Sequence, residues 1–284
     1  MDAHALEAAL RPADGEQCVF DTNPVLNERL THYCPGCLHG VAHRLVSEVL
    51  HELNLAPRTI LVAAVGCATF TYDYFNVDGL EAPHGRACAV ATGVRRARPE
   101  AVVFTYQGDG DMAAIGLAES LHAANRGERI TSIFINNTVY GMTGGQMAPT
   151  TLLGQKTTTT PEGRCLAREG GPVHLAEIMA GLEGVAFAAR CALDSVAHVR
   201  AAKIALRRAF EVQIQNRGFG FLELLSSCPT NWHMDPVTAA RHVAESMIPV
   251  FPLGVFKDKA AAPSGKPSDA ANESEHTAGG AADA

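Results

Sequence analysis

The strongest constraint on the fold of this chain is a set of apolar runs that each stop at glycine, asparagine or cysteine. Continuous apolar runs of this length are typical of strands that are buried on both faces of a parallel sheet. Alternating strands and helices predict an α/β fold with a doubly wound, mostly parallel sheet, whose ligands bind at the carboxyl ends of the strands. The expected strands are 58–67, 101–111, 129–137 and 218–229, and the expected helices are 40–53, 112–126, 174–182 and 195–210.

Length and composition fit one large α/β domain. The chain has 284 residues, of which 47% are hydrophobic and 19% are charged, and this profile is that of a globular protein. Residues 257–284 consist mainly of Ala, Ser, Gly, Pro and charged residues without an apolar period, so they predict a disordered tail. We therefore expect an N-terminal arm at 1–30, a folded domain at 31–256 and the tail at 257–284.

Charge and hydropathy exclude several classes of partner. The net charge is −7 and no run of Lys or Arg stands out, so nucleic acid is not an expected partner. The N-terminus has no basic segment ahead of an apolar one, which argues against a secretory signal. The most apolar stretch, 60–70, is far shorter than the roughly 18 residues of a membrane span. We expect a cytoplasmic protein that does not associate with membranes.

A Gly-Asp-Gly sequence ends the second expected strand. Glycines 108 and 110 let the backbone approach an oxyanion, and the helix that follows presents free N–H groups. Asp109 between them suits a hard cation such as Mg²⁺, and Asn137, 28 residues later at the end of the next strand, supplies a second oxygen donor. Helix capping is the alternative for these carboxylates, and Asp111 fits capping or a favourable first-turn charge.

The segment after Asn137 lacks charge of its own. Residues 136–151 read NNTVYGMTGGQMAPTT, which offers amides, hydroxyls and glycine backbone but no ionised side chain. Such a segment suits a site where the ligand itself brings the charge, as a metal-bound diphosphate does. The threonines at 157–160 are interpreted as plain loop or strand edge.

Several motifs together resemble a known family. Gly-Asp-Gly followed by Asn-Asn at this spacing resembles the fingerprint of thiamine diphosphate (ThDP) enzymes. The full set resembles the ThDP-binding β subunit of 2-oxoacid:ferredoxin oxidoreductases, over roughly residues 30–235. The motifs are YCPGCLHG (33–40), VGCATF (65–70), LEAPHGR (80–86), TYQGDGD (105–111), NNTVYGMTGGQMAPTT (136–151) and SSCP (226–229).

The resemblance implies a fold of the ThDP diphosphate-binding type and a set of cofactor ligands. It implies that Asp109, the side chain of Asn137 and the main-chain carbonyl of Val139 bind Mg²⁺. It also assigns a position beside the cofactor to Val65, Gly66, Cys67, Ala68, Gly108, Gly110, Asp111, Gly141, Met142 and Thr143.

The resemblance further implies a [4Fe–4S] cluster on Cys34, Cys37, Cys67 and Cys228. Position in the chain agrees with this, because Cys67 and Cys228 end expected parallel strands and the CxxC pair precedes the helix at 40–53. A structural zinc site is the alternative, although zinc ribbons usually use two such pairs. The remaining cysteines are expected to be core or surface thiols, at 18, 88, 165 and 191.

Two further residues of the matched motifs carry open questions. His84 is expected to contact the substrate or the aminopyrimidine, with an ordinary loop histidine as the alternative. Arg86 either pairs with a carboxylate or supports a subunit contact. The family usually has glycine where this chain has Leu38; a leucine there would be strained at positive φ, which leaves the role of His39 open.

The implied activity is oxidative decarboxylation of a 2-oxoacid, such as 2-oxoglutarate or 2-oxoisovalerate. Coenzyme A takes the acyl group, and electrons pass through the cluster to ferredoxin or a ferredoxin-like subunit. We find no second ThDP half and no CxxCxxCxxxC run, so an α subunit with the pyrimidine-binding domain is the expected partner. The alternatives are a non-redox ThDP decarboxylase or carboligase, and a zinc-stabilised scaffold without turnover.

Overall fold

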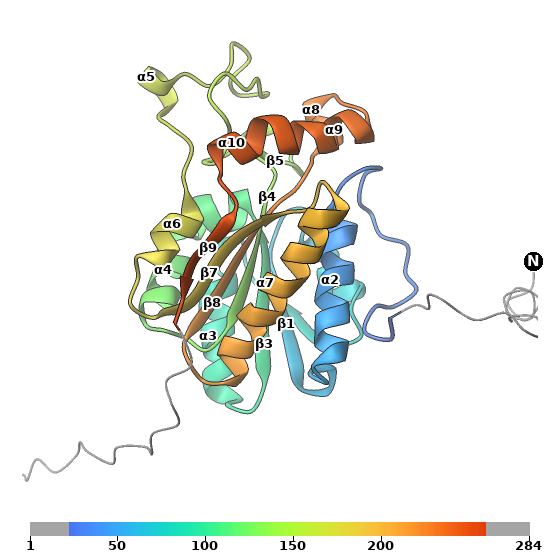
Figure 1. The fold of residues 1–284 in the computed structure, drawn as a ribbon, viewed down its shortest axis with the longest axis vertical. Helices are drawn as coiled ribbons and strands as arrows, with labels where there is room; N and C mark the ends of the chain where they lie inside the picture. The colour runs from blue at the N-terminus through green and yellow to red at the C-terminus, as the bar shows by residue number, and fades with distance from the viewer. Residues whose placement is uncertain (1–22, 260–284) are drawn as a thin grey trace, which may run out of the picture.

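The computed structural model describes residues 23–259 and contains a seven-stranded sheet (Figure 1). The strand order is β2-β1-β3-β4-β8-β7-β9, and all neighbours are parallel except β7 and β9. This confirms the predicted doubly wound, mostly parallel α/β fold. The strands are β1 (Thr59–Ala63), β2 (Asp78–Glu81), β3 (Val102–Gly108), β4 (Thr131–Asn136), β7 (Val185–Ala192), β8 (Phe219–Leu225) and β9 (Gly254–Asp258).

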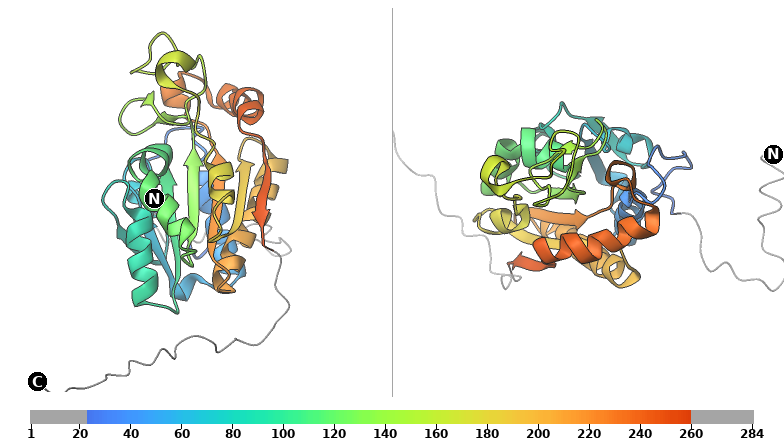
Figure 2. Two further views of the ribbon diagram at one scale, coloured as in Figure 1. Left: turned by 90° about the vertical axis from the view of Figure 1, so that its left-hand side faces the viewer. Right: turned by 90° about the horizontal axis from the view of Figure 1, so that it is seen from above.

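Helices cover both faces of this sheet (Figure 2). On one face α2 (His39–Glu52) packs against α7 (Val196–Ile214), and on the other α3 (Ala87–Ala97) packs against α4 (Leu117–Asn125). Next to α4, α6 (Leu175–Ala180) contacts β7 and β8. Apolar side chains from both layers form a single large core with the central strands. Each fully buried phenylalanine of that core contributes roughly 1.5–3 kcal/mol relative to an exposed one.

Shorter elements lie beyond the carboxyl ends of the strands (Figure 1). They include a small hairpin that follows β4 and several short helices that precede β9. These elements are β5 (Val139–Tyr140), β6 (Gln146–Met147), α5 (Leu166–Glu169), α8 (Pro229–Trp232), α9 (Pro236–His242) and α10 (Ile248–Val250). Two 3₁₀ turns, Ala56–Arg58 and Thr69–Asp73, flank β1.

Register brings the ends of the central strands together. Gly108 at the end of β3 pairs with Ile135 of β4, and Asn136 at the end of β4 pairs with Leu225 of β8. The residues that follow these three strands therefore leave the sheet at one edge. Because parallel sheets bind ligands at that edge, the fold places the Gly-Asp-Gly, Asn-Asn and Ser-Ser-Cys segments where a shared site is possible.

Three details differ from the sequence predictions. The helix expected at 112–126 is divided into a π-helical turn, Gly110–Ile115, and α4; such turns often occur at functional sites. Strand β9 continues to Asp258, past the predicted start of the tail at 257. The rest of the tail and residues 1–22 of the arm lie outside the described residues. The elements β2, α3, β7 and β9 were not predicted, nor were the short elements beyond the carboxyl ends of the strands.

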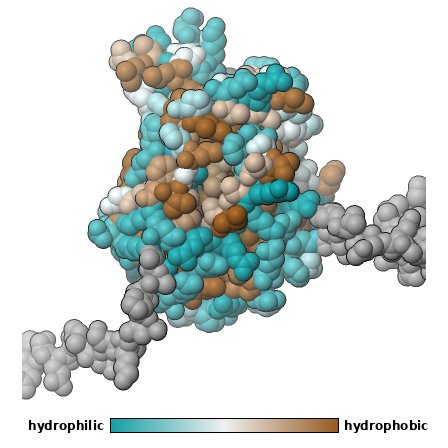
Figure 3. Space-filling view, in the orientation of Figure 1, coloured by the Kyte–Doolittle hydropathy of each residue, from teal (hydrophilic) through white to brown (hydrophobic). Residues whose placement is uncertain are grey.

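The face seen in Figure 3 carries an apolar cleft between α7 and β9, where hydrophobic residues gather among polar ones. Its volume is about 790 Å³, and Ile204 and Val255 beside it are 71% and 60% exposed. Exposed apolar surface of this kind often marks a contact site for another polypeptide. None of the helices that the structure describes combines the length and the apolar character of a membrane span.

Candidate active site

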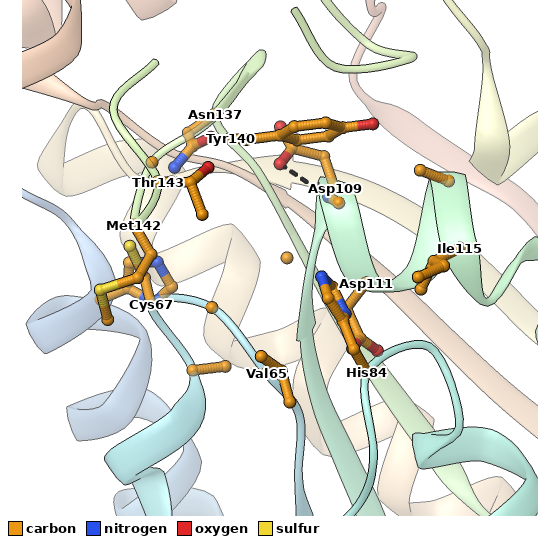
Figure 4. A pocket seen from close by; sticks show the side chains of 17 residues that line it. Val65, Cys67, His84, Asp109, Asp111, Ile115, Asn137, Tyr140, Met142 and Thr143 are labelled. Carbon is orange, nitrogen blue, oxygen red and sulfur yellow. Dashed lines mark hydrogen bonds and ion pairs between the residues drawn. The ribbon is translucent and has the colours of Figure 1, made fainter. Parts of the chain in front are cut away.

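A cavity of about 300 Å³ opens at the carboxyl edge of β1, β3 and β4 (Figure 4). Cys67 and Met142 lie on one side of it, and His84 with Asp111 on the other. All ten positions assigned to the cofactor from the sequence line this cavity, together with several that were not. The lining residues are His39, Val65, Gly66, Cys67, Ala68, His84, Gly108, Asp109, Gly110, Asp111, Ala114, Ile115, Asn137, Tyr140, Gly141, Met142 and Thr143.

Three oxygen atoms of the expected magnesium ligands meet beside this cavity. The side-chain oxygen of Asn137 faces the main-chain oxygen of Val139 at 2.7 Å and Oδ2 of Asp109 at 3.2 Å. Facing oxygens repel one another unless a proton donor or a cation lies among them. Rotation of the Asn137 amide supplies two N–H donors, and a hard divalent cation relieves the same repulsion with the amide as it stands. The donor set therefore fits Mg²⁺.

Burial makes Asp109 a carboxylate in need of a positive partner. Its side chain is almost fully buried, and burial raises the pKa of Asp109 to about 7 despite hydrogen bonds from Thr150 and the main chain. The hydroxyl of Thr150 donates to Oδ2 at 3.2 Å, and the N–H of Gly110 donates to Oδ1 at 3.0 Å. Asp109 therefore does cap the turn that follows, but with one oxygen only. Its other oxygen faces Asn137.

The main chain that carries Asn137 is held in an unusual conformation. Thr138 has φ of +63°, which is uncommon for a β-branched residue. Gln155 donates to the hydroxyl of Thr138 at 2.9 Å, and Thr151 donates to its carbonyl oxygen. Asn136 accepts from its N–H at 3.2 Å. These contacts over-determine the turn, which is the condition for such strain to persist at a ligand site.

The four cysteines assigned to the cluster come from three segments that are tied together. Ser227 donates to the carbonyl of Gly36 at 2.7 Å, which brings the CxxC loop beside the end of β8. Asn231 donates to Sγ of Cys228 at 3.2 Å and to the carbonyl of Gly141 at 2.9 Å. A Cβ on Gly141 would lie 3.1 Å from Sγ of Cys67 and 3.7 Å from Sγ of Cys228. The main chain at 141 thus approaches two of the sulfurs closely.

Electrostatics also relates these thiols to one another. Burial first, and the neighbouring thiols of the group second, raise the pKa of Cys37 and of Cys67 to about 12. Burial likewise raises the pKa of Cys228, where Cys34 and Asp109 add to the effect. The mutual effects on pKa show that these thiols lie in one region of the protein. In the described chain, no three His, Cys, Asp or Glu side chains form a group able to hold a metal ion.

The remaining cysteines and Leu38 are placed by the structure as follows. Cys88 is buried and donates to Gln107 at 3.2 Å, as a core thiol; Cys165 and Cys191 are partly buried, and Cys18 lies outside the described residues. Leu38 has φ of −88°, so this position does not require glycine, and the backbone strain expected for a leucine at positive φ is absent.

His84 is held by Asp111. Nδ1 of His84 lies 2.7 Å from Oδ2 of Asp111, which also accepts from the N–H of Gly85 at 2.7 Å. The amide of Gln107 donates to the other oxygen of Asp111 at 2.7 Å. Asp111 therefore orients the His84 loop rather than capping a helix. With Nδ1 engaged, Nε2 is the ring nitrogen left to meet a ligand.

Two assigned side chains make contacts within the chain. Arg86 pairs with Glu119 of α4 at 2.8 Å and donates to the carbonyl of Ile115 at 3.3 Å, so the carboxylate with which it pairs belongs to this chain. The hydroxyl of Thr143 donates to Gln146 at 2.5 Å. Gly116 permits the close approach of the His84 loop, since a Cβ there would lie 2.4 Å from the carbonyl oxygen of Gly85.

Sequence reasoning missed four lining residues, namely His39, whose role it left open, Ala114, Ile115 and Tyr140. His39 is buried and bonds through Nδ1 to the hydroxyl of Tyr106 at 2.8 Å; burial lowers the pKa of His39 to about 3, so it is neutral. The ring of Tyr140 packs on Gly110. Tyr140 lies within the quoted 136–151 motif, so an aromatic residue after the Asn-Asn pair was the available signal.

The supporting shell was missed as well. Arg164 is 5% exposed and donates to main-chain carbonyls on both sides of it, including those of Pro149 and Thr151 at 2.9 and 2.6 Å. It thereby fixes the segment that supplies Thr150 and Thr151 to the Asp109 and Thr138 contacts. An isolated arginine in a loop gives no sequence signal of this role.

With this geometry established, comparison with known proteins is informative. Residues 64–224 match the family described as thiamine pyrophosphate enzyme, C-terminal TPP binding domain. This chain belongs to the thiamine pyrophosphate enzyme family. Within that family it is 40% identical over 205 residues to the 2-oxoglutarate synthase subunit KorB of Methanocaldococcus jannaschii, with 72% of each chain covered. At this identity and coverage, the chain and that subunit belong to one family.

Two further relatives extend the comparison. The ketoisovalerate oxidoreductase subunit VorA of Methanothermobacter thermautotrophicus is 45% identical over 252 residues, which cover 89% of this chain and 53% of VorA. The chain therefore spans about half the length of that relative. A solved 2-oxoglutarate:ferredoxin oxidoreductase from Magnetococcus marinus, with 2-oxoglutarate, coenzyme A and succinyl-CoA bound, matches with a TM-score of 0.67 at 23% identity, covering 85% of this chain and 87% of that one. At that identity the likeness shows the fold.

Proposed function

We propose that this chain is the ThDP-binding β subunit of a 2-oxoacid:ferredoxin oxidoreductase. The reaction joins a 2-oxoacid and coenzyme A to give an acyl-CoA and CO₂, and it releases two electrons to ferredoxin or a ferredoxin-like subunit through a [4Fe–4S] cluster. The observation that carries the proposal is the meeting of the Asp109, Asn137 and Val139 oxygens next to a cavity whose other wall is Cys67. Both proposed sites adjoin the peptide segment at Gly141, where a Cβ would approach Sγ of Cys67, Sγ of Cys228 and the Asn137 amide.

The donor types present, carboxylate and carbonyl oxygens on one side and cysteine thiols on the other, are those that bind Mg²⁺ and iron–sulfur clusters. Asp109, Asn137 and Val139 would hold Mg²⁺, the main chain at Gly110 and Gly141 would lie along the diphosphate, and the cluster would take its ligands from Cys34, Cys37, Cys67 and Cys228. When bound, ThDP supplies the electron sink for decarboxylation of the 2-oxoacid and the cluster takes up electrons singly.

The chain's own side chains orient and bind. Asp111 holds the ring of His84 through Nδ1 at the cavity wall, and we assign to Nε2 a hydrogen bond with the oxo or carboxylate oxygen of the substrate. His39 stays neutral because it is buried, so its contribution is hydrogen bonding rather than charge. Ile115 and Met142 at the mouth, 53% and 47% exposed, are available to be covered by a partner subunit, which would exclude water.

The cavity wall supports an aliphatic 2-oxoacid such as 2-oxoisovalerate. Among the described residues, no Lys or Arg lines the cavity, whereas Val65, Ala114, Ile115 and Met142 do. A second carboxylate, as in 2-oxoglutarate, needs a cationic or hydrogen-bonding partner when it is buried. If the acid is 2-oxoglutarate, that partner must come from the α subunit. The similarity to VorA, a ketoisovalerate oxidoreductase subunit, agrees with the aliphatic assignment.

An α subunit that carries the pyrimidine-binding domain is the proposed partner. ThDP activation requires a carboxylate beside the aminopyrimidine, and we assign it to that subunit. The apolar cleft between α7 and β9 is one surface available for a subunit contact. A cytoplasmic location is proposed, because the described cysteines are free and a thiolate-bound cluster suits a reducing compartment.

Anaerobic purification of the chain with its α subunit tests the proposal. We expect four iron atoms and one ThDP per chain, visible absorbance that dithionite bleaches, and CoA-dependent reduction of ferredoxin with 2-oxoisovalerate. Cys228→Ser should lose iron, and Cys165→Ser is the matched control that should keep it. Colourless protein with stoichiometric zinc would support the scaffold instead, and ThDP-dependent CO₂ release without iron would support a non-redox decarboxylase. The chain without its α subunit should be inactive.

A further inference from the structure

A pocket rich in arginine lies at the opposite edge of the sheet from the active-site cavity. It has a volume of about 370 Å³ and is lined by Arg95 and Arg96 at the end of α3 and by Arg126, Glu128 and Arg129 between α4 and β4. We call this set the arginine pocket. Strand β3 separates the two edges with seven residues, which corresponds to about 20 Å. The arginine pocket is therefore distinct from the proposed ThDP site.

The arginine pocket is strongly positive although the whole chain is acidic. Four guanidinium groups face one carboxylate there, whereas the chain as a whole has a net charge of −7. The carboxyl ends of α3 and α4 each add roughly −0.5 of a charge, so helix ends offset about one of the three excess positive charges. Compensation of the helix dipoles therefore does not account for the four arginines of the arginine pocket.

The geometry leaves guanidinium N–H groups free. Oε1 of Glu128 accepts from Nη2 of Arg96 at 2.5 Å and from Nε of Arg126 at 2.9 Å, and this holds the two arginines side by side. Nη1 of Arg129 donates to Asn216 at 3.1 Å. Among the described residues, neither Nη atom of Arg126 makes a hydrogen bond, and the Arg126 side chain is 44% exposed.

A buried arginine lies behind these exposed ones. Arg95 is 9% exposed and is anchored by Nε to the carbonyl of Arg129 at 3.1 Å and by Nη2 to Asn216 at 3.3 Å. In the described part of the chain it forms no ion pair with a carboxylate. Burial lowers the pKa of Arg95, and the guanidinium groups of Arg129 and Arg58 lower it further. A nearly buried cation with other cations beside it is stabilised by an external anion.

We propose that the arginine pocket binds a small anion that carries phosphoryl groups. The planar fork of arginine matches the oxygens of a phosphoryl group with two parallel hydrogen bonds. Arg126 and Arg129 supply the free donors, Arg95 supplies buried positive charge, and Glu128 keeps Arg126 in place. The pocket volume accommodates a diphosphate or the phosphates of a nucleotide but not a protein segment of any length.

Calorimetric titration of the full-length protein, saturated beforehand with ThDP and Mg²⁺, tests this proposal. Inorganic pyrophosphate and ATP are titrated separately. We expect saturable binding at one site, and a loss of affinity of at least tenfold in the double variant Arg126→Gln/Arg129→Gln. The matched control is Arg200→Gln/Arg241→Gln, which removes the same charge from exposed positions on α7 and α9 and should bind like the parent.

Each outcome is decisive. Equal affinity for both anions assigns recognition to the phosphates alone, and binding of ATP only assigns it to a nucleotide; both support the proposal if Arg126 and Arg129 are required. Absence of saturable binding to the parent overturns it, as does equal weakening of the control variant or unchanged binding by Arg126→Gln/Arg129→Gln. The ThDP content and melting temperature of all variants, measured in parallel, separate this result from a failure of the active-site proposal or of folding.

Discussion

Replacement of Arg190 by methionine probes the largest fully buried side chain of the protein. Arg190 on β7 is wholly buried, and its Nε donates to Oε2 of Glu223 on β8 at 2.9 Å. Its two Nη atoms bond Glu177 at 2.9 and 2.5 Å. Arg190→Met conserves length and apolar contact with Phe251 and Phe256, but leaves Glu223 buried beside no cation.

The magnitude follows from the exposure of the two carboxylates. Loss of one partner from a fully buried pair costs about 3–5 kcal/mol, and the side chain of Glu223 is 0% exposed. Burial already raises the pKa of Glu223 with Arg190 present, and loss of the cation raises it further, so protonation of the acid brings the cost toward the lower bound, about 3 kcal/mol. The side chain of Glu177 is 37% exposed, so Glu177→Gln should cost about 1 kcal/mol or less.

Urea unfolding followed by far-UV circular dichroism measures these differences in free energy of unfolding. In the double variant Arg190→Met/Glu223→Gln the neutral amide still accepts from Asn136, as Glu223 does at 2.8 Å, so this variant should be more stable than Arg190→Met alone. Asn136 also supports the turn that carries Asn137, so Arg190→Met should weaken Mg²⁺–ThDP binding as well. The reasoning fails if Arg190→Met lies within about 1 kcal/mol of the parent, or if the added Glu223→Gln gives no recovery.

Three more predictions follow from the same contacts. Arg164→Met should lower the affinity for ThDP at least tenfold in calorimetry, because it releases the segment at 148–151 that bears Thr150. The control Arg168→Met replaces an exposed neighbouring arginine and should bind ThDP like the parent. Equal affinities of the two variants would refute the role of Arg164. Gly141→Val should lose cluster iron, because the new side chain would clash with Sγ of Cys67. Gly40→Val, where a Cβ contacts nothing within 4 Å, should retain the iron. A full iron content in both variants would contradict the close approach at Gly141. Burial holds the pKa of His43 well below its ordinary value of about 6.5. The unfolded chain therefore binds more protons than the folded chain, and stability is lost as pH falls below about 6.5, by up to about 1.4 kcal/mol per pH unit. In urea unfolding, His43→Phe should flatten this dependence between about pH 6.5 and 5, and an unchanged slope would count against the prediction.

Sequence patterns predicted the parts of the fold that are uniformly apolar or punctuated by special residues. Strands β3, β4 and β8 are buried along nearly their whole length, so apolar residues predominate in their sequences. Residues Gly108 to Gly110 and Asn137 stood out because a ligand-binding turn needs small or polar residues where apolar ones are expected. The residues assigned to ThDP therefore lie around one cavity, although their roles remain proposals.

The missed elements and contacts have a physical reason. Strand β2 is an edge strand with mostly exposed side chains, so it has no apolar run, and β7 contains Arg190, whose charge is satisfied only by residues distant in sequence. The contacts of Arg164 go to main-chain carbonyls, which every residue possesses. Such interactions depend on where the loop lies in space, and no local pattern encodes them.

The close approach of the Gly141 main chain to two cysteine sulfurs has a consequence for electron transfer. This main chain borders the cavity proposed for ThDP, and a Cβ there would lie 3.1 Å from Sγ of Cys67, which lines the same cavity, and 3.7 Å from Sγ of Cys228. Residue 141 therefore places no side chain between that cavity and the two sulfurs. If ThDP and the cluster bind as proposed, electron transfer between them would cover a short distance past bare main chain.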